Sequence, residues 1–552
     1  MRFVFYLLLL LPFSCFSQNT VGLISLLDGF SIGGYNLIYP ENQSTVFLLN
    51  ECGEIVHTWE DHPDNRPGKT AYLLPNGNLL RSKIDVEKMT EPTIGTGGGG
   101  GVIELLTWNN ETQWCYVLAD EDTRQHHDIH YMENGHVLLI AWERIGFDEM
   151  LENGFDSTAN MQDSYWPDFI RELNPVTNDT VWEWHAWDHL VQDYDSTRLN
   201  FGTVSDHPEL IDINYNEYSA GRPDWMHSNA IDYDPVKDQI VLSVRNFNEI
   251  WIIDHSTTTG EAAGHTGGNS GKGGDLLFRW GNPKAYKRGA TSDRQLFLQH
   301  DAQWIDDFVD PDYEFYGHIA LYNNFINGNT SLGQVLSPVW DSLSNSYLQT
   351  DGLFLPTGFS RTFSHPDTSK NLSGIASSIQ IMGDGHVIFC AANQGFLFEL
   401  TPEDNVVWQY RTPIKLGYPI EQGTILNPGN NVTFQLERYP ENFSGLLGKD
   451  LSAKGFIELN PNTSFCLFTD VEEIKAENDL NIFPNPAGGY LFIENNKGSV
   501  IEITVFNSLG RTMLAPTIIS GTEKLDVTKW PDGIYFLKEK NKNKINRFVV
   551  SK

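Results

Sequence analysis

Three segments of the chain place histidines beside other polar residues that could do chemistry. Residues 125–130 read Gln-His-His-Asp-Ile-His, residues 224–229 read Asp-Trp-Met-His-Ser-Asn, and residues 299–304 read Gln-His-Asp-Ala-Gln-Trp. Arg245 ends the apolar run that follows the second segment. An imidazole can act as a nucleophile, an acid or a base, and a guanidinium offers a planar fork of donors to an oxyanion. A single histidine is more often structural, but three similar segments favour a shared site.

The elements around these segments repeat along the chain. Between about residues 21 and 469, an apolar strand leads through a polar turn to a second strand that ends in Trp, as at Trp59, Trp184 and Trp408. Asn-Gly or Asp-Gly hairpins alternate with this pair of strands, and such dipeptides suit type I′ turns. This repetition predicts an all-β fold, a β-propeller whose blades surround a central channel. The Trp residues are then expected to pack between blades.

Each histidine segment opens a strand of this repeat. Equivalent positions on successive blades meet around the channel, so residues that are far apart in sequence can form one site. Residues 323–366 do not follow the repeat, and we expect them to cover the channel as a lid.

The motifs resemble those of the bacterial aryl-sulfate sulfotransferase (arylsulfotransferase) family. The resemblance runs from about Phe47 to Trp408 and is strongest at residues 227–235, 243–246 and 299–302. It implies a six-bladed β-propeller and a sulfotransferase independent of PAPS. The reaction it implies moves a sulfuryl group from an aryl sulfate donor to a phenolic acceptor through a sulfohistidine.

The resemblance also implies roles for individual residues. His300 would be the nucleophile. The partners that bind and stabilise the group would be His127 (or, as the less favoured choice, His126), His227, Asn229 and Arg245. No metal, cofactor or nucleotide donor is required.

The residue types suit this chemistry. A neutral imidazole can attack sulfur, and fixed donors such as Arg245 would stabilise the charge that develops on the sulfuryl oxygens. His127 could protonate the departing phenolate and later deprotonate the incoming phenol. Asp301 could fix the tautomer of His300, although in a regular strand its side chain points to the opposite face.

Two other functions remain open. The chain could be a non-catalytic propeller that binds carbohydrate or protein at the cell surface, or an aryl sulfatase in which water replaces the phenol. The sequence leaves open the physiological donor and acceptor, the choice between transfer and hydrolysis, and the oligomeric state.

Three further motifs are interpreted as loops. Residues 95–101 are rich in glycine but lack the strand and helix of a phosphate loop. Residues 267–274 lack the first glycine and the final Ser or Thr of a P-loop. Residues 306–312 fail the EF-hand pattern, and whether they hold a structural calcium stays open.

The N-terminus predicts export. Residues 1–17 combine one positive charge, a short apolar run and small residues, which is typical of a secretory signal peptide. The propeller domain is assigned to residues 18–475. No later apolar stretch is long enough to span a membrane, so no transmembrane segment is expected in the mature chain. The pairing of Cys52, Cys115, Cys390 and Cys466 is left open.

Residues 476–552 differ in composition from the rest. They carry more Lys and Arg than Asp and Glu, and short alternating strands predict a small C-terminal β-sandwich. Residues 482–486, 505–511, 533–535 and 547–552 resemble a type IX secretion C-terminal sorting domain. The resemblance implies the type IX secretion machinery as partner, with the protein then secreted or attached at the cell surface.

The composition sets wider limits. The chain of 552 residues has a formal net charge of −35, which argues against a nucleic-acid partner because such binding neutralises phosphates with basic residues. Aromatic residues make up 12% of the chain, so a sizeable core can be buried.

Overall fold

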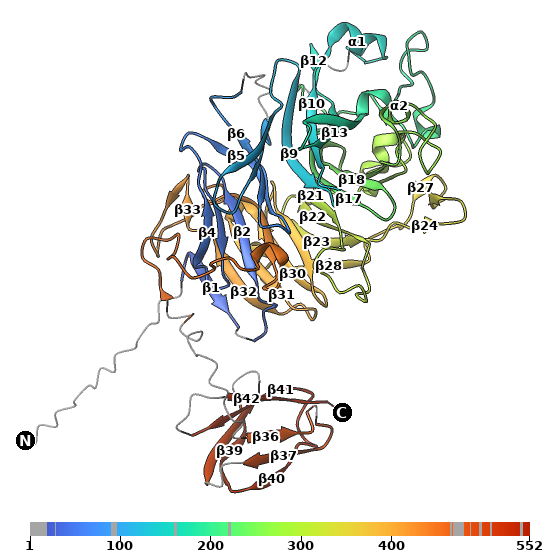
Figure 1. Cartoon of the computed structure of the whole chain (residues 1–552). Coiled ribbons are helices and arrows are strands. Elements are labelled where there is room, and N and C mark those ends of the chain that lie inside the picture. The colour runs from blue at the N-terminus through green and yellow to red at the C-terminus, as the bar shows by residue number, and fades with distance from the viewer. Residues whose placement is uncertain are drawn as a thin grey trace, which may run out of the picture. The chain divides into compact units, whose positions relative to one another are not determined.

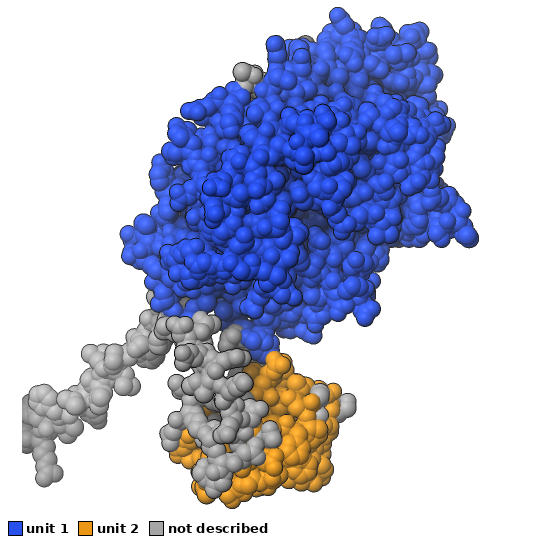
Figure 2. Space-filling view, in the orientation of Figure 1, with its two compact units in different colours: residues 1–466 blue, residues 467–552 orange. Residues whose placement is uncertain are grey.

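The chain forms two compact units, residues 1–466 and 467–552 (Figure 2). The computed structural model describes residues 19–27, 29–89, 97–158, 163–218, 222–463, 466, 480–485, 487–495, 500–507, 511–540 and 545–551. The predicted signal peptide lies outside these residues. The described residues contain far more β-strand than helix, as predicted for an all-β fold. Each unit is presented by itself.

The described part of the first unit contains six antiparallel sheets of four or five strands (Figure 1). In spatial order, the first three are β5 (Arg66–Leu73), β6 (Leu79–Ile84), β7 (Val102–Leu106) and β8 (Thr112–Val117); β9 (Thr123–Tyr131), β10 (Val137–Glu143), β13 (Asp168–Asn174) and β14 (Asp179–His185); and β17 (Ser228–Asp234), β18 (Gln239–Val244), β19 (Glu249–Asp254) and β20 (Phe278–Trp280).

The other three sheets follow the same plan. They are β21 (His300–Trp304), β22 (Ile319–Ile326), β23 (Thr330–Leu336) and β28 (Arg361–Phe363); β29 (Ser378–Met382), β30 (His386–Ala391), β31 (Phe396–Leu400), β32 (Val406–Arg411) and β1 (Gly22–Leu26); and β35 (Thr433–Tyr439), β2 (Tyr35–Pro40), β3 (Val46–Leu49) and β4 (Ile55–Trp59).

Strands from the two ends of the unit share sheets. β2 pairs with β35, and β1 pairs with β32, so the last two sheets each need N-terminal residues to be complete. A disulfide between Cys52 and Cys466 adds a covalent link between the same two ends. Cys115 and Cys390 are free thiols.

Side chains join the first strands of neighbouring sheets to one another. The Asp128 carboxylate accepts from the Ile231 amide, that of Asp232 from Trp304, and that of Asp301 from Ile379. The series continues where Gln380 accepts from the Arg438 amide, the Tyr439 hydroxyl from the Leu73 amide, and Asp128 from the Tyr72 hydroxyl. The strands β5, β9, β17, β21, β29 and β35 are therefore successive neighbours.

The recurring Trp residues bridge the outer parts of adjacent sheets. The indole N–H groups of Trp59, Trp182 and Trp408 donate to Thr107, Thr257 and Glu51, each on or beside the next sheet. Each of these indoles is almost completely buried. The predicted role of Trp in packing between repeats is confirmed.

Short elements fill the connections. The helices are α1 (Phe147–Glu152) and α2 (Thr259–Ala262), with 3-10 turns η1 (Ala186–Asp188), η2 (Val204–Asp206), η3 (Arg245–Phe247), η4 (Pro283–Tyr286), η5 (Thr291–Asp293), η6 (Thr368–Lys370), η7 (Ala392–Gln394) and η8 (Ser444–Leu446). Two-stranded pairs are β11 (Ile145–Gly146) with β12 (Ser164–Tyr165), β15 (Leu190–Val191) with β16 (Ile211–Asp212), β24 (Trp340–Asp341) with β25 (Ser346–Tyr347), β26 (Gln349–Thr350) with β27 (Leu353–Phe354), and β33 (Ile414–Lys415) with β34 (Tyr418–Pro419). Within the described part of the chain, no helix has the length and apolar character needed to cross a membrane.

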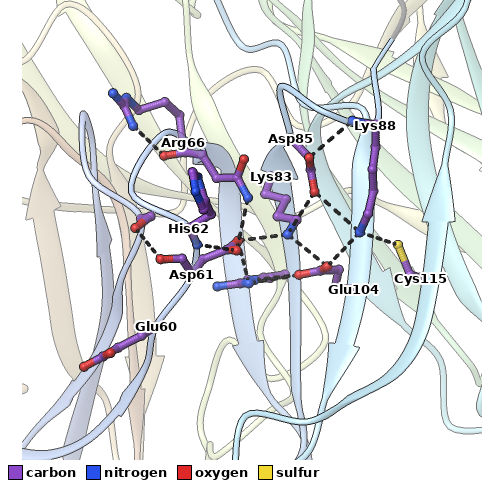
Figure 3. Close-up of polar contacts among 12 residues, drawn as sticks. Glu60, Asp61, His62, Arg66, Lys83, Asp85, Lys88, Glu104 and Cys115 are labelled. Carbon is purple, nitrogen blue, oxygen red and sulfur yellow. Dashed lines mark hydrogen bonds and ion pairs between the residues drawn. The ribbon is translucent and has the colours of Figure 1, made fainter.

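A buried group of ion pairs braces the sheet that begins with β5 (Figure 3). The Lys83 ammonium lies 2.9 Å from carboxylate oxygens of both Asp61 and Glu104, and 3.3 Å from one of Asp85. Its side chain is 4% exposed. Arg81 on the same strand pairs with Asp61 and Glu104. These contacts tie β6 and β7 to the segment that follows β4.

The described part of the second unit contains two sheets that share one apolar core. They are β36 (Leu480–Phe483), β37 (Tyr490–Asn495) and β40 (Thr522–Asp526), and β39 (Thr512–Ile519), β38 (Ile501–Asn507), β41 (Gly533–Glu539) and β42 (Ile545–Val550). Leu491 and Ile493 from the first sheet pack with Ile503, Leu537 and Phe548 from the second. This is the two-layered β-structure that the alternating sequence predicted.

Candidate functional site

A cavity of about 280 Å³ lies where several first strands begin. Its walls carry three of the predicted histidines together with charged, aromatic, amide and small or apolar residues: Glu41, Lys69, Gly97, Gly98, His127, Tyr218, Arg222, Asp224, His227, Arg245, Asn246, His300, Ile375, Ala376, Val432 and Phe434. The predicted residues His127, His227, Arg245 and His300 therefore meet in one place, although 173 positions separate His127 from His300 in the numbering.

Irregular backbone at the strand starts aims these side chains. Register shifts interrupt the pairing of β9, β17 and β21 with their neighbours at the histidine segments. His127 and His227 both adopt positive φ, 48° and 56°, which is uncommon for residues other than glycine. Bulges and left-handed residues redirect side chains, and they concentrate at functional sites.

His300 is held by two hydrogen bonds that determine its tautomer. Its Nδ1 lies 2.9 Å from Oδ1 of Asn324. The Asn324 amide nitrogen donates to the carbonyl groups of Ser373 and Ala376, so its oxygen must be the atom that faces His300. His300 therefore donates from Nδ1 and carries its lone pair on Nε2, which accepts from the Ala376 amide at 3.1 Å.

The environment keeps His300 neutral. Burial, followed by the nearby Arg245 charge, lowers the pKa of His300 to about 3. A neutral imidazole with a defined lone pair is the nucleophilic form of this side chain.

His227 is paired with a carboxylate. Its Nδ1 donates to Asp224 Oδ2 in a short hydrogen bond, and the other Asp224 oxygen accepts from the Trp142 indole at 3.1 Å. The carboxylate orients the ring through Nδ1, which leaves Nε2 as the atom for proton transfer. Asp224 lies within the sequence segment that drew attention to His227 but was not predicted as a site residue.

His126 and His127 occupy different environments. His127 lines the cavity, and burial together with nearby His227 lowers its pKa well below the ordinary value. His126 is fully buried, stacks on Trp142 at 3.9 Å between ring centroids, and contacts His127 through Nδ1 atoms 2.8 Å apart. His126 is not among the residues that line the cavity, and it supports His127 from behind.

The glycine-rich loop is part of the site. The sequence predicted a plain loop over residues 95–101, of which 95 and 96 lie outside the described residues. Gly98 accepts from the His127 amide, and a Cβ added to Gly98 would lie 1.8 Å from the His127 ring. Only glycine fits at this position, where φ is 88°.

The cavity is basic although the chain is acidic. Three cationic side chains line it, those of Lys69, Arg222 and Arg245, against two carboxylates. Of these, Glu41 pairs with Lys69 at 2.7 Å and Asp224 is bonded to His227. Arg245 donates one hydrogen bond to the neighbouring Asn246 side chain. An anionic substrate can therefore find compensating charge within a protein of net charge −35.

Two other predicted residues lie outside the cavity lining. The side-chain amide of Asn229 donates to the backbone carbonyl of Gln299, so Asn229 supports the segment just before His300. Asp301, with φ of 59°, turns away from His300 and accepts from the Ile379 amide and the Gln303 side chain. Asn324 holds the His300 tautomer instead.

The segment at residues 323–366 does not form the expected lid. It contributes β23 and β28 to a sheet, and its short strands pack Tyr347 and Phe354 against Phe278. None of its residues is among those that line the cavity. Its residue Asn324 reaches the site only from behind His300.

A second cavity of about 540 Å³ lies further along the same strands. It is lined by acidic residues that include Asp128, Asp232, Asp301, Asp306 and Glu437. Burial raises the pKa of Asp301 and of Asp306 to about 8. The larger cavity is therefore acidic, in contrast to the cavity that contains His300.

Comparisons with known proteins agree with the motifs. Residues 108–337 match the family model described as Arylsulfotransferase (ASST), and residues 481–551 match that of the Secretion system C-terminal sorting domain. A search of curated proteins found no match. The first match includes His127, His227, Arg245, His300 and Asn324.

Solved structures with some similarity include two bacterial proteins. One is a protein of unknown function from Bacteroides caccae, with 11% identity and a TM-score of 0.39, covering 73% of this chain and 98% of that one. Another is virginiamycin B lyase from Staphylococcus aureus, with 12% identity and a TM-score of 0.32, covering 72% and 89%. By the two family matches, the chain carries an arylsulfotransferase (ASST) family region at residues 108–337 and a secretion system C-terminal sorting domain at residues 481–551.

Proposed function

We propose that this protein is an aryl-sulfate sulfotransferase that works without PAPS and passes the sulfuryl group through His300. The observation that carries the proposal is the arrangement around His300: Asn324 assigns its lone pair to Nε2, and His127, His227 and Arg245 share its cavity. The match to the arylsulfotransferase family supports the class of reaction.

In the first half-reaction, Nε2 of His300 attacks the sulfur of the aryl sulfate. The bond from sulfur to the aryl oxygen breaks, and its electron pair leaves with the phenolate. The His300 ring becomes cationic, so its hydrogen bond from Nδ1 to Asn324 strengthens as charge develops. The Ala376 amide, released from Nε2, becomes available to a sulfuryl oxygen, and Arg245 supplies further donors.

His227 is the proposed acid and base, in place of the role that the sequence analysis gave to His127. The Asp224 carboxylate holds His227 through Nδ1 and leaves its Nε2 for proton transfer, whereas burial lowers the pKa of His127 well below its ordinary value. His227 Nε2 protonates the departing phenolate. In the second half-reaction it removes the proton of the incoming phenol, whose oxygen attacks sulfur and breaks the bond to His300. His127 then serves as a neutral donor to the sulfuryl oxygens.

The cavity also suits an aromatic ring. Phe434 lies with its ring centroid 6.1 Å from that of His127 and 6.3 Å from that of His300, and Ile375 and Val432 add apolar surface. Rings at this distance contribute edge-to-face contacts. The ring of the aryl donor and then the ring of the phenolic acceptor would pack against this same apolar wall.

We further propose that the six sheets are the blades of one closed six-bladed propeller, spanning residues 18–475. The hydrogen bonds that link successive first strands support it. The sorting domain implies export and a secreted or cell-surface location. In this proposal residues 1–17 are the signal peptide, and residues 476–552 engage the type IX machinery.

The deciding experiment measures aryl sulfate cleavage by the chain without residues 1–17, with and without added phenol. The transferase predicts phenol-dependent release of the aryl product, formation of a sulfated phenol, and a ³⁵S-labelled protein intermediate. His300→Ala should abolish all three, whereas His62→Ala, at an exposed histidine, should change none. Release of the aryl product that does not depend on added phenol but requires His300 would indicate a sulfatase. A folded protein with no turnover of any aryl sulfate would instead favour a binding propeller.

A further inference from the structure

We propose that His189, His265 and Asp275 form a metal-binding site separate from the catalytic cavity. One ligand atom from each residue lies within 4.8 Å of the other two. The site would take a divalent transition ion, with Zn²⁺ the best match, because two imidazoles and one carboxylate are ligands that Zn²⁺ prefers. None of these residues lines the sulfotransferase cavity, so this inference does not depend on the proposed function.

Asp275 stands between the two histidines. Its Oδ1 lies 2.9 Å from Nδ1 of His189 and 2.7 Å from Nδ1 of His265. Three ligand atoms thus converge from two parts of the chain, one after β14 and two from the connection between β19 and β20. Small side-chain rotations would bring all three atoms to about 2.0–2.2 Å from one ion.

The hydrogen bonds of His189 favour a cation at this point. Its Nε2 lies 2.8 Å from the carbonyl oxygen of Ala262 in α2, and a carbonyl can only accept, so Nε2 must carry a proton. In the neutral ring Nδ1 is then a lone pair that faces a carboxylate oxygen. The His189 side chain is 0% exposed and that of Asp275 is 9% exposed, so the two facing acceptor atoms lie largely away from water. A bound divalent ion converts both facing lone pairs into ligands.

The surroundings resemble the support of a built metal site. A metal-bound histidine commonly donates its other N–H to a backbone carbonyl, as His189 does to Ala262. The Trp184 ring stacks on His189, and its indole donates to Gly274 at 2.7 Å. A Cβ at Gly274 would lie 2.6 Å from Nε2 of His189, so the backbone passes close to the ring.

Access is available from one side. The His265 side chain is 60% exposed, whereas those of His189 and Asp275 are at most 9% exposed. An ion could therefore enter past His265 and keep water as a fourth ligand. Bound there, it would attach the glycine-rich segment of residues 267–274, which the sequence analysis interpreted as a loop that lacks the P-loop pattern, to His189 and α2.

The test uses untagged chain without residues 1–17, stripped of metal and titrated with ZnCl₂ and separately with CoCl₂. We expect one equivalent of Zn²⁺ per chain, visible absorption from the Co²⁺ form, and a higher midpoint of thermal unfolding with Zn²⁺. His265→Ala and Asp275→Asn should weaken binding more than about 10-fold. His265 is exposed, so its replacement leaves the fold intact.

His62→Ala is the matched control, because His62 is another exposed histidine beside a carboxylate, that of Asp64. It should bind Zn²⁺ as the unaltered chain does. Failure of the unaltered chain to bind Zn²⁺ or Co²⁺ at 100-fold molar excess would overturn the proposal. So would binding that His265→Ala and Asp275→Asn leave unchanged, since the ion would then lie elsewhere.

Discussion

Asn324 fixes the reactive face of His300, because its Oδ1 lies 2.9 Å from the histidine Nδ1 while its amide nitrogen is held by two carbonyl groups. The asparagine therefore cannot exchange its oxygen for its nitrogen without losing both of those hydrogen bonds. Through this constraint a residue that is not among those lining the cavity decides which ring nitrogen of His300 can attack a substrate.

Replacing Asn324 should impair the chemistry more than the fold. In Asn324→Ala the His300 Nδ1 loses its acceptor, so the ring can take the other tautomer and its cationic form loses a stabilising contact. We expect the rate of intermediate formation to fall about 10–100-fold, as measured by rapid quench with a ³⁵S-labelled aryl sulfate. Asn323→Ala is the control, since Asn323 is equally buried but bonds to Phe297 and Gln334 instead. Equal losses in both variants would contradict a positioning role.

A methyl group on Gly98 should disable the site. The added Cβ would lie 1.8 Å from the His127 ring, and the φ of 88° disfavours any side chain. Gly98→Ala is therefore expected to displace His127 and reduce aryl sulfate turnover at least about 100-fold. Gly97→Ala provides the comparison, because nothing lies within 4 Å of its added Cβ. Steady-state assays of the two variants check this, and an active Gly98→Ala protein would show that His127 is dispensable.

The pair formed by His227 and Asp224 should matter most when the leaving group is poor. A nitrophenolate departs without protonation, whereas an unsubstituted phenolate needs an acid. Asp224→Asn should therefore slow cleavage of phenyl sulfate by about 10²–10⁴-fold and that of nitrophenyl sulfate much less. The measurement is the cleavage rate for a series of aryl sulfates, and the logarithm of that rate is plotted against the pKa of the leaving phenol. A steeper slope in Asp224→Asn than in the unaltered protein is the expected result. A slope equal to that of the unaltered protein would assign the proton transfer to another group.

The sequence predicted the strands but could not predict how the backbone departs from them. Apolar alternation and recurring Trp were enough to indicate the all-β class, because sheet packing follows local pattern. The histidines were found because their residue types are unusual at strand starts. Asn324 carried no such signal, since a buried asparagine in an apolar strand looks like ordinary sheet sequence. The direction of the Asp301 side chain was ambiguous for a related reason. A bulge at the start of a strand changes which residues lie on each face, and the apolar periodicity of the sequence does not show where bulges occur.

The same limit applies to residues that meet through folding alone. His189 and Asp275 are 86 positions apart, and His265 sits in a loop whose only visible pattern is glycine. Asp224 was quoted within its motif, yet only the structure shows its hydrogen bond to His227. Contacts of this kind form only when segments that are far apart in the sequence come together in the fold. The local spacing of residues in a single sequence does not indicate which segments will meet.

Asp301 should make the folded chain less stable as pH rises toward about 8. The pKa of Asp301 is raised to about 8 from 3.8, chiefly by burial, so the folded state holds a proton that the unfolded state releases. The stabilisation is complete below pH 3.8 and is lost as pH rises through about 8. Asp301→Asn mimics the neutral acid, so its unfolding midpoint should drop less between pH 6 and pH 9 than that of the unaltered chain. Thermal melts at both values check this, with Asp64→Asn as an exposed control. An unchanged pH dependence in Asp301→Asn would mean that Asp301 is already ionised at pH 6.

The ion-pair group around Lys83 should respond very differently to two lysine replacements. Lys83 is 4% exposed and contacts Asp61, Asp85 and Glu104, whereas Lys88 is 43% exposed and contacts Asp85 and Glu104 at 3.4 and 3.6 Å. Removing the buried cation leaves carboxylates that Arg81 alone cannot neutralise, so Lys83→Met should destabilise the first unit by about 3–5 kcal/mol. Lys88→Met should cost at most about 1 kcal/mol, because water already screens its charge. Denaturant unfolding of both variants tests the difference. Equal decreases in the free energy of unfolding would mean that the carboxylates beside Lys83 are protonated or hydrated in the folded chain. In that case Lys83 would not be the residue that holds β6 and β7 to the segment after β4.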